Sequence, residues 1–560
     1  MFIQKIKNML KIECINTNRI KKFPFGTRLY DIMKETAPNL KYPVLGALVD
    51  NEVQELAFRI IKPHKVDFFD ITHQDGMRMY FRSLYYVLMK AVKDIMPDAD
   101  LMIEHRVSKG YFCEIKGLNL TDNPKLIEDI KLQMQKIIKA DYPFIRKDIL
   151  NSEAVKIFES NNLPEKANLF KQSPALYTSI YQLDNMLDYF YGYLVPSTGY
   201  LTKFDLIPLY DGMLLKIPQR NNPDKLETFV KQDKMFDILD EHKHWVKALN
   251  SANVGRLNDR ITEGSGGELI KISEALHEKK IAEIADKIKE KKSIKLILIA
   301  GPSSSGKTTF SKRLAVQLIV AGLKPVQISL DNYFVNREDT PLDENGDYDF
   351  ETIDAIDRKT FAENINDLQQ GKTVEIPKFD FETGKRFYDE TKISADNETV
   401  IIAEGIHALN PKLTKHIADE TKYRIYISAL TQIGIDGHNR IPTTDNRLLR
   451  RIIRDYKYRG YSAFETLKRW PSVRRGEEKN IFPFQEHADI MFNSALLYEL
   501  ALLKKYAEPL LKNICQKEKE FAEAKRVLKF LSYFKDLNEE DEIPPTSILR
   551  EFLGDSSFHY

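Results

Sequence analysis

The stretch "KLILIAGPSSSGKTTFSKRLAVQLIVAG", residues 295–322, joins an apolar run to a loop of small residues and then to a helical pattern. Small residues let backbone amides curl around a phosphate chain at the positive end of the following helix. Residues 301–308 fit G-x-x-x-x-G-K-[ST], which predicts a P-loop, and the alternative is a glycine-rich turn with a chance lysine. Lys307 is expected to reach the β- and γ-phosphates, and the Thr308 hydroxyl to ligate Mg²⁺. The predicted phosphate-binding residues are Gly301, Ser303, Ser304, Ser305, Gly306, Lys307, Thr308 and Thr309.

The pattern around this loop predicts a parallel α/β sheet. Four runs, "SIKLILIA", "PVQISL", "TVIIAEG" and "YRIYISAL", are apolar and rich in β-branched residues, and helical stretches separate them. Strands that are apolar on both faces, with crossover helices between them, are typical of such sheets. We expect this α/β domain to span residues 293–560, including the long amphipathic helices near its end.

Two acidic residues follow strands of the predicted sheet. Asp331 comes directly after "PVQISL", and Glu404 comes directly after "TVIIA". Chemistry in open parallel sheets gathers at the carboxyl ends of the strands. Asp331 is therefore a candidate base for phosphoryl transfer, and Glu404 a candidate Mg²⁺ ligand. The alternatives are a turn aspartate and a surface acid at a strand end.

An arginine-rich helical stretch, "DNRLLRRIIRDYKYRG" (residues 445–460), follows later in the chain. It holds more arginines than its own acidic residues can pair. The sharper interpretation is a lid that closes over a transferring phosphoryl group, and the simpler one is a solvated basic face. The arginines of this stretch are Arg447, Arg450, Arg451, Arg454 and Arg459.

Taken in order, the P-loop, "SLDNYF", "YDFETIDAID", "IIAEGIHAL" and "RRIIRDYKYRG" resemble the uridine kinase and phosphoribulokinase group of P-loop kinases. The resemblance covers roughly residues 293 to 500. It implies ATP and Mg²⁺ as cofactors, a nucleoside as substrate, and Asp331 as the base toward the 5′-hydroxyl. It further implies roles for Glu404 with Thr308 at Mg²⁺, Asp349 at the ribose, Phe379 and Arg386 at the substrate, and Arg454 and Arg459 in the lid. Uridine-cytidine kinases hold the pyrimidine with a Tyr and a His, where this chain has Phe379 and Gly384.

The first 292 residues predict two α+β domains and a helical linker. Residues 1–64 resemble a TGS domain, and residues 65–217 resemble the second additional domain of threonyl- and alanyl-tRNA synthetases. Residues 218–292 are expected to be a helical linker. In the synthetases, HxxxH and a later Cys and His form an editing site. The matching positions here are Arg82, Tyr86, Phe190 and Leu194, so we expect this module to bind no zinc and to be catalytically inactive.

Composition limits the partners and the compartment. The formal net charge of +2 gives no general argument for a nucleic-acid partner, and the short basic run at residues 19–25 makes RNA contact through the N-terminal half only an alternative to a solvated turn. Three scattered cysteines and no apolar stretch of membrane-spanning length predict a cytoplasmic protein without a membrane partner. We also expect a homo-oligomer.

The sequence is compatible with three classes of function. The first is an ATP-dependent nucleoside kinase with a regulatory or scaffolding N-terminal half. The second is a TGS-bearing P-loop NTPase that acts as a switch on RNA or ribosomes, but the chain lacks any Asn-Lys dipeptide and so cannot carry the N-K-x-D guanine motif of GTPases. The third, a tRNA-editing protein, is disfavoured because the editing residues are missing.

Overall fold

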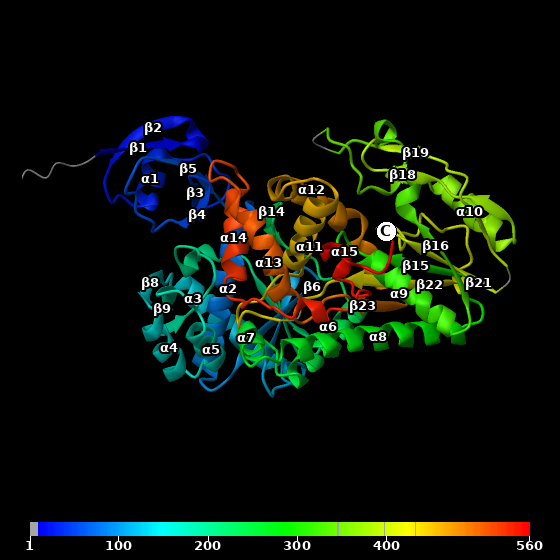
Figure 1. Ribbon diagram of the computed structural model, residues 1–560. Helices are drawn as coiled ribbons and strands as arrows, with labels where there is room; N and C mark the ends of the chain where they lie inside the picture. Colours follow the sequence, from blue (N-terminus) through cyan, green and yellow to red (C-terminus); the bar gives the residue numbers. More distant parts are fainter. Residues whose placement is uncertain (1–8, 344–345, 397, 432, 560) are drawn as a thin grey trace, which may run out of the picture.

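The computed structural model describes residues 9–343, 346–396, 398–431 and 433–559, which form three parts along the chain (Figure 1). A small sheet unit comes first, an α+β unit second, and a larger α/β unit last. This confirms the predicted fold class, in which two α+β domains precede a C-terminal α/β domain with a parallel sheet.

The first unit is a five-stranded sheet in the order β2-β1-β5-β3-β4, packed on one helix. Its strand β5 pairs in parallel with β1 and antiparallel with β3, so the unit continues to Phe69 and the predicted boundary at residue 64 is too early. Ile12, Leu29 and Ile32 form its core. The elements are β1 (Met9–Cys14), β2 (Arg19–Pro24), α1 (Leu29–Thr36), β3 (Gly46–Val49), β4 (Glu52–Glu55) and β5 (His64–Phe69).

The second unit packs the long helix α2 against two antiparallel sheets, in the orders β11-β12-β7-β6 and β10-β9-β8. The His73 side chain caps α2 by accepting a hydrogen bond from the Asp75 amide. The elements are α2 (Gln74–Ile95), β6 (Leu101–Val107), β7 (Gly110–Ile115), α3 (Pro124–Lys139), β8 (Phe144–Leu150), α4 (Asn151–Ser160), α5 (Pro164–Lys171), β9 (Tyr177–Leu183), β10 (Met186–Asp188), β11 (Asp205–Leu209) and β12 (Gly212–Lys216).

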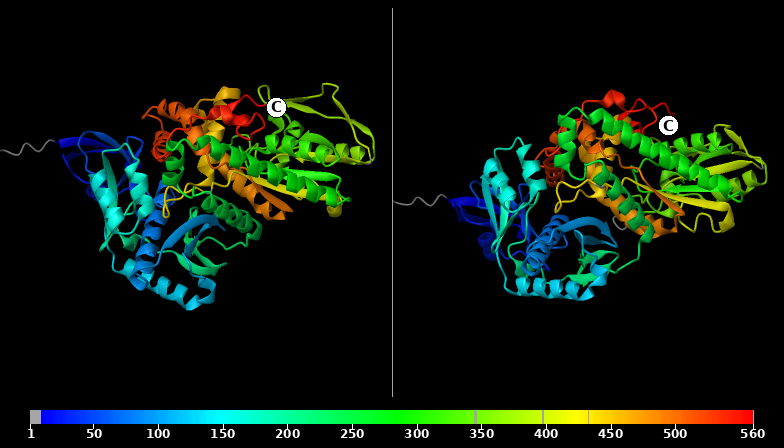
Figure 2. Two further views of the ribbon diagram at one scale, coloured as in Figure 1. Left: turned by 60° about the horizontal axis from the view of Figure 1, so that its bottom comes forward. Right: turned by 90° about the horizontal axis from the view of Figure 1, so that it is seen from below.

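The segment predicted as a helical linker differs from that expectation at its start and in its role. It opens with an antiparallel hairpin, β13 (Pro218–Gln219) and β14 (Asn222–Leu226), before α6 (Asp233–Ala248), α7 (Val254–Thr262) and α8 (Gly266–Glu290). The apolar face of α8 joins the core of the α/β unit, so α8 is a covering helix of that domain. Figure 2 shows it running alongside the sheet.

The last unit is built on a five-stranded parallel sheet in the order β16-β21-β15-β22-β23. Every residue of β15 and β21 is buried, as expected for apolar strands covered on both faces. The elements are β15 (Leu296–Ala300), α9 (Lys307–Val320), β16 (Lys324–Ser329), α10 (Arg358–Gln369), β21 (Thr399–Glu404), β22 (Lys422–Ser428), α11 (Thr443–Tyr458), α12 (Ala463–Asn480), β23 (Ile490–Asn493), α13 (Glu499–Lys512), α14 (Phe521–Leu531) and α15 (Arg550–Leu553).

A small lobe extends from one end of this sheet. It holds α10 and two short hairpins, which pair β17 (Thr373–Glu375) with β20 (Lys392–Ser394) and β18 (Lys378–Asp380) with β19 (Lys385–Phe387). The lobe lies beside the C-terminal end of the chain in Figure 1.

Partly buried ion pairs join the second unit to the α/β unit. Arg78 of α2 binds Glu523 of α14, and Arg526 of α14 binds Asp445 at the start of α11. These contacts tie α2 to the arginine-rich helix through α14. None of the helices in the described part of the chain has the length and apolar character that crossing a bilayer requires.

Candidate phosphoryl-transfer site

The loop between β15 and α9 has the backbone of an anion cradle. Ser304 and Gly306 have left-handed backbone angles, with φ of 58° and 84°. A Cβ atom on Gly301 would collide with the carbonyl oxygen of Ile427, so this position requires glycine. The buried hydroxyls of Ser304 and Ser305 have no hydrogen-bond partner among the described residues. Such orphaned polar groups in a loop that opens a helix suit a bound phosphate.

Lys307 and Thr308 begin α9 next to the edge where Glu404 ends β21. The Lys307 ammonium donates to the Pro302 carbonyl at 3.2 Å, within the loop itself. The Thr308 hydroxyl lies 3.5 Å from Glu404 Oε1, and the Ser329 hydroxyl donates to the same oxygen at 3.0 Å. The structure therefore brings the P-loop and the acid of the third predicted strand into one place.

Burial and the nearby Asp331 carboxylate raise the pKa of Glu404 to about 7, and Lys307 only partly opposes this rise. Two carboxylates that crowd one another in a buried site favour a cation between them. Among the described residues no group of three or more His, Cys, Asp or Glu side chains is arranged to hold a metal. Mg²⁺ does not need such a cage, because it binds through one or two carboxylates together with substrate phosphates. Thr308 and Glu404 fit that requirement, and the nearby Asp331 carboxylate adds negative charge beside them.

The arginines of α11 divide into two groups. Arg447 and Arg450 are fully buried and paired with Glu477 and Glu499, so they hold the fold together. Arg447 also donates to the Ser303 carbonyl at 3.0 Å, which fixes α11 against the P-loop.

Arg451, Arg454 and Arg459 form the second group and share one acid, Asp455. Arg451 reaches the Ser303 hydroxyl at 2.8 Å. Burial and its two arginine neighbours lower the pKa of Arg454 to about 10, and no described residue hydrogen-bonds to its Nε atom. This surplus of positive charge beside the P-loop suits a polyphosphate.

Asp349 and Glu351, in the motif predicted to contact the acceptor, differ in what their carboxylates contact. One carboxylate oxygen of Asp349 accepts a hydrogen bond from the Glu351 amide at 3.1 Å, so Asp349 shapes the turn. Glu351 is partly buried, and its buried Oε2 atom has no hydrogen-bond partner among the described residues. Burial and Glu477 raise its pKa to about 7, whereas Arg451 and Lys307 act in the opposite direction. Glu351 therefore faces the basic side of the site.

Phe379 and Arg386 lie on the hairpin of the small lobe. The Phe379 ring is 5.5 Å from that of Phe334, which follows the turn that carries Asp331. Arg386 instead binds Asp357 at 2.7 Å. Arg459, the residue that follows α11, lies over the ring of Phe381 at 5.9 Å, so the lobe and the end of the arginine-rich helix meet.

Residues 296–499 match the model of the "Phosphoribulokinase / Uridine kinase family". A uridine kinase from Staphylococcus aureus strain JH9 is 31% identical over 201 residues, which cover 36% of this chain and 87% of that protein. The chain belongs to the phosphoribulokinase/uridine kinase family. Its α/β unit is accordingly a P-loop kinase domain.

The N-terminal half has a different relative. A threonine–tRNA ligase from Clostridium kluyveri is 30% identical over 192 residues, which are 34% of this chain and 30% of the ligase. The chain thus spans about a third of the length of that ligase. Solved structures that match part of the chain include a "Possible Uridine Kinase" from Bacillus stearothermophilus, at 17% identity and a TM-score of 0.24, covering 36% of this chain and 89% of that one. Another is a D-glycerate 3-kinase from Cryptococcus neoformans, at 11% identity and a TM-score of 0.22, covering 47% and 89%.

One residue beside the kinase P-loop comes from the far end of the chain. Glu551 of α15 accepts hydrogen bonds from the Thr309 amide at 3.2 Å and from the Thr309 hydroxyl at 2.7 Å. Ile548 packs so closely on Gly306 that a Cβ there would collide with it. Lys457 of α11 donates to the Leu553 carbonyl, which fastens the segment. The Glu551 carboxylate therefore occupies two hydrogen-bond donors of Thr309 that could otherwise bind a phosphate oxygen.

Sequence reasoning missed both Glu351 and Glu551. Glu351 comes two residues after Asp349 in the motif "YDFETIDAID". The motif indicated that this segment belongs to the site, but it did not indicate which of its acids faces the P-loop. Glu551 has no motif around it, and only the docking of α15 brings it to the loop.

The positions that match the synthetase editing site are part of the packed interior. The Tyr86 hydroxyl lies within hydrogen-bond distance of backbone carbonyls in both β9 and β10, and Phe190 and Leu194 belong to the hydrophobic core. Arg82 reaches the Tyr193 carbonyl at 2.6 Å.

Proposed function

We propose that the chain is an ATP-dependent kinase that transfers the γ-phosphoryl group to the 5′-hydroxyl of a nucleoside. The observation that carries this proposal is the shared position of Thr308, Ser329 and Glu404, because it unites the phosphate loop with the strand end that carries Asp331. In this assignment Lys307 and the arginines hold the phosphates, and Asp331 orients the acceptor hydroxyl and accepts its proton. Mg²⁺, held by Thr308 and Glu404, would neutralise phosphate charge.

The test is a coupled assay for ADP production with purified chain, ATP and Mg²⁺ against a panel of nucleosides, sugar phosphates and pantothenate-like alcohols. We expect turnover with at least one nucleoside and its 5′-monophosphate as product. Turnover only with a sugar phosphate would contradict the nucleoside assignment but leave the kinase assignment in place.

Base selectivity is expected to be modest. Gly384 has a φ of 73°, and a Cβ atom there would collide with Arg337, so this position offers no side chain to read a base edge. Sites that hydrogen-bond a substrate group reject analogues without it by about 10⁴-fold or more, and apolar contacts, such as stacking on Phe379, discriminate far less. Values of kcat/KM for uridine, cytidine and purine nucleosides check this. Strict uridine specificity would show that another residue reads the base.

Replacing Glu551 with Gln is expected to tighten ATP binding. The neutral amide competes less well for the Thr309 donors and removes a negative charge from the phosphate site, which corresponds to about a tenfold lower Kd. Calorimetric titration with ATP measures this. Glu542→Gln is a matched control, because Glu542 lies nearby in the chain and pairs with Lys271 at the surface. An unchanged or weaker affinity in Glu551→Gln would mean that the nucleotide does not displace this carboxylate.

The N-terminal half is proposed to be catalytically inactive and to regulate or support the kinase domain. The core roles of Tyr86, Phe190 and Leu194 favour this, since core side chains cannot position a catalytic water. A TGS-bearing switch on RNA or ribosomes remains the second candidate. It predicts RNA-stimulated ATP hydrolysis without phosphorylation of any small acceptor, and this outcome separates the two.

A further inference from the structure

Arg82, in the middle of α2, is a buried cation without an acidic partner. Only 6% of its surface is exposed. Its guanidinium donates to the Tyr193 carbonyl, and its Nε atom has no hydrogen-bond partner in the described part of the chain. Among the described residues no carboxylate lies within ion-pair distance of it. Burying a charge is costly unless an opposite charge compensates it.

The backbone around Arg82 leaves room for its guanidinium. A Cβ atom on Gly192 would collide with that group, so glycine is required beside it. Arg82 stacks on the Tyr191 ring at 5.3 Å, and Arg146 of β8 stacks on the Tyr193 ring at 5.4 Å. The two arginines are therefore held on the rings of Tyr191 and Tyr193, which are close in sequence. This stacking fixes the orientation of their N–H donors without a ligand.

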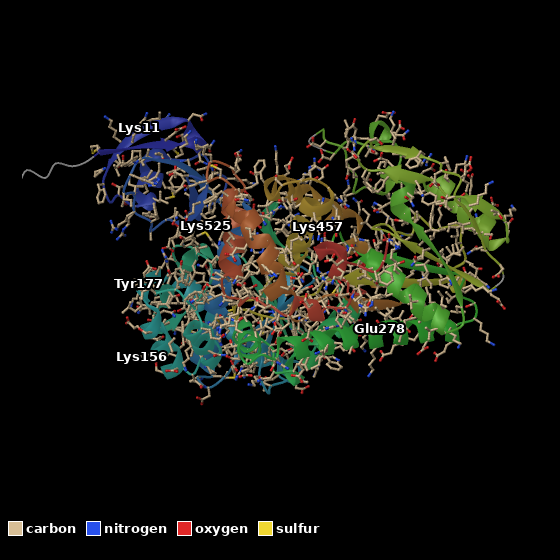
Figure 3. All side chains as sticks on the ribbon, viewed as in Figure 1. Lys11, Lys156, Tyr177, Glu278, Lys457 and Lys525 are labelled. Carbon is tan, nitrogen blue, oxygen red and sulfur yellow. The ribbon has the colours of Figure 1, made fainter. Side chains whose placement is uncertain are left out.

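Helix α14 adds two lysines to this group. Lys525 pairs with Glu52 of β4, and it lies on the part of α14 next to the first unit (Figure 3). Lys529, one turn further along, has no ion-pair partner among the described residues. Desolvation of its ammonium group, together with the charges of Arg82, Arg146 and Lys525, lowers the pKa of Lys529 to about 8, although the residue as a whole is exposed.

The acids near this group are already engaged. Asp148 binds Arg146 at 3.0 Å. Glu55 accepts from the Tyr181 hydroxyl at 2.8 Å and lies 3.9 Å from Arg146. Glu52 binds Lys525. Four cations thus face three carboxylates, and Arg82 and Lys529 are the two cations left without one.

We propose that Arg82, Arg146 and Lys529 bind the phosphate group of a small phosphorylated molecule where the three parts of the chain meet. Two guanidinium groups and one ammonium group match a tetrahedral dianion with several acceptor oxygens. Sites of this kind occur preferentially between domains. The site is separate from the P-loop, so the proposal is independent of the kinase reaction.

The experiment measures binding of inorganic phosphate to the full chain carrying Lys307→Ala, which weakens the P-loop as a competing phosphate site. Calorimetric titration is expected to show binding in this background. Adding Lys529→Gln is expected to weaken it about tenfold or more, because a charge-assisted hydrogen bond is lost. Lys512→Gln is the matched control, since Lys512 is exposed and pairs with Glu508 on α13. Arg82→Met, which keeps the aliphatic stem, should abolish the binding.

Three outcomes would overturn the proposal. They are no phosphate binding in the Lys307→Ala background, equal binding with Lys529→Gln, or binding of a single-stranded RNA that depends on Lys529 while inorganic phosphate does not bind. The third would assign the cations to a nucleic-acid backbone. If Arg82→Met does not fold, the phosphate titration of Lys529→Gln tests the proposal, because Lys529 is exposed and its replacement is not expected to disturb folding.

Discussion

Replacing Asp331 with Asn is expected to lower kcat by at least ~10², which corresponds to about 2.7 kcal/mol of added barrier. The amide is nearly isosteric, so the fold is expected to persist. The P-loop residues that would hold ATP do not depend on this carboxylate, so the Kd for ATP should be nearly unchanged. What is lost is a group that orients the acceptor hydroxyl and accepts its proton, and positioning matters as much as proton removal when the transition state is loose.

The measurement is steady-state turnover on the best nucleoside found, together with an ATP titration. Asp367→Asn serves as control, because Asp367 is an acid of α10 that pairs with Lys372 away from the P-loop. Lys307→Ala should instead weaken ATP binding itself. Near-normal turnover in Asp331→Asn would mean that the acceptor does not lie at this strand end, and the nucleoside-kinase proposal would fail with it.

The parts of the candidate site that lie in short, continuous sequence motifs could be predicted from the sequence. The strand, loop and helix of the P-loop are contiguous, and the acid of "TVIIAEG" follows directly from a buried strand that ends at the active edge. The structure places Glu404 next to Thr308 for that reason. Lys307 also lies where the motif predicts, because the loop and the start of α9 fix it.

Long-range contacts were not predictable in the same way. Glu551 reaches Thr309 only because α15 packs on the P-loop, across a separation of 242 residues. The arginine-rich stretch gave no sign that Arg447 and Arg450 would be buried against Glu477 and Glu499, since those acids lie on other helices. The domain boundary at residue 64 failed similarly, because β5 joins the first sheet through pairing with β1 and β3.

Replacing Glu404 with Gln is expected to lower kcat at a fixed Mg²⁺ concentration by ~10² or more, since the neutral amide is a much weaker ligand for a hard cation. Glu398→Gln is the matched control. It precedes the opposite end of the same strand and pairs with Lys324 at the surface. A loss in Glu404→Gln that higher Mg²⁺ concentrations partly relieve, with normal turnover in Glu398→Gln, would support a metal role for this strand end, and a loss that added Mg²⁺ leaves unchanged would contradict it.

The pH dependence supplies a second readout with a defined sign. Burial and Asp331 raise the pKa of Glu404 to about 7, so in the free enzyme a proton occupies this carboxyl below that pH and competes with Mg²⁺. The Mg²⁺ concentration needed for half-maximal rate should therefore rise as pH falls from about 8 to about 6, and approach a tenfold rise per unit well below the pKa. Glu404→Gln has no proton to release, so its residual activity should lose this dependence. An equally steep Mg²⁺ requirement in the variant would show that another group titrates, and Glu404 would then not be the ligand whose deprotonation admits the metal.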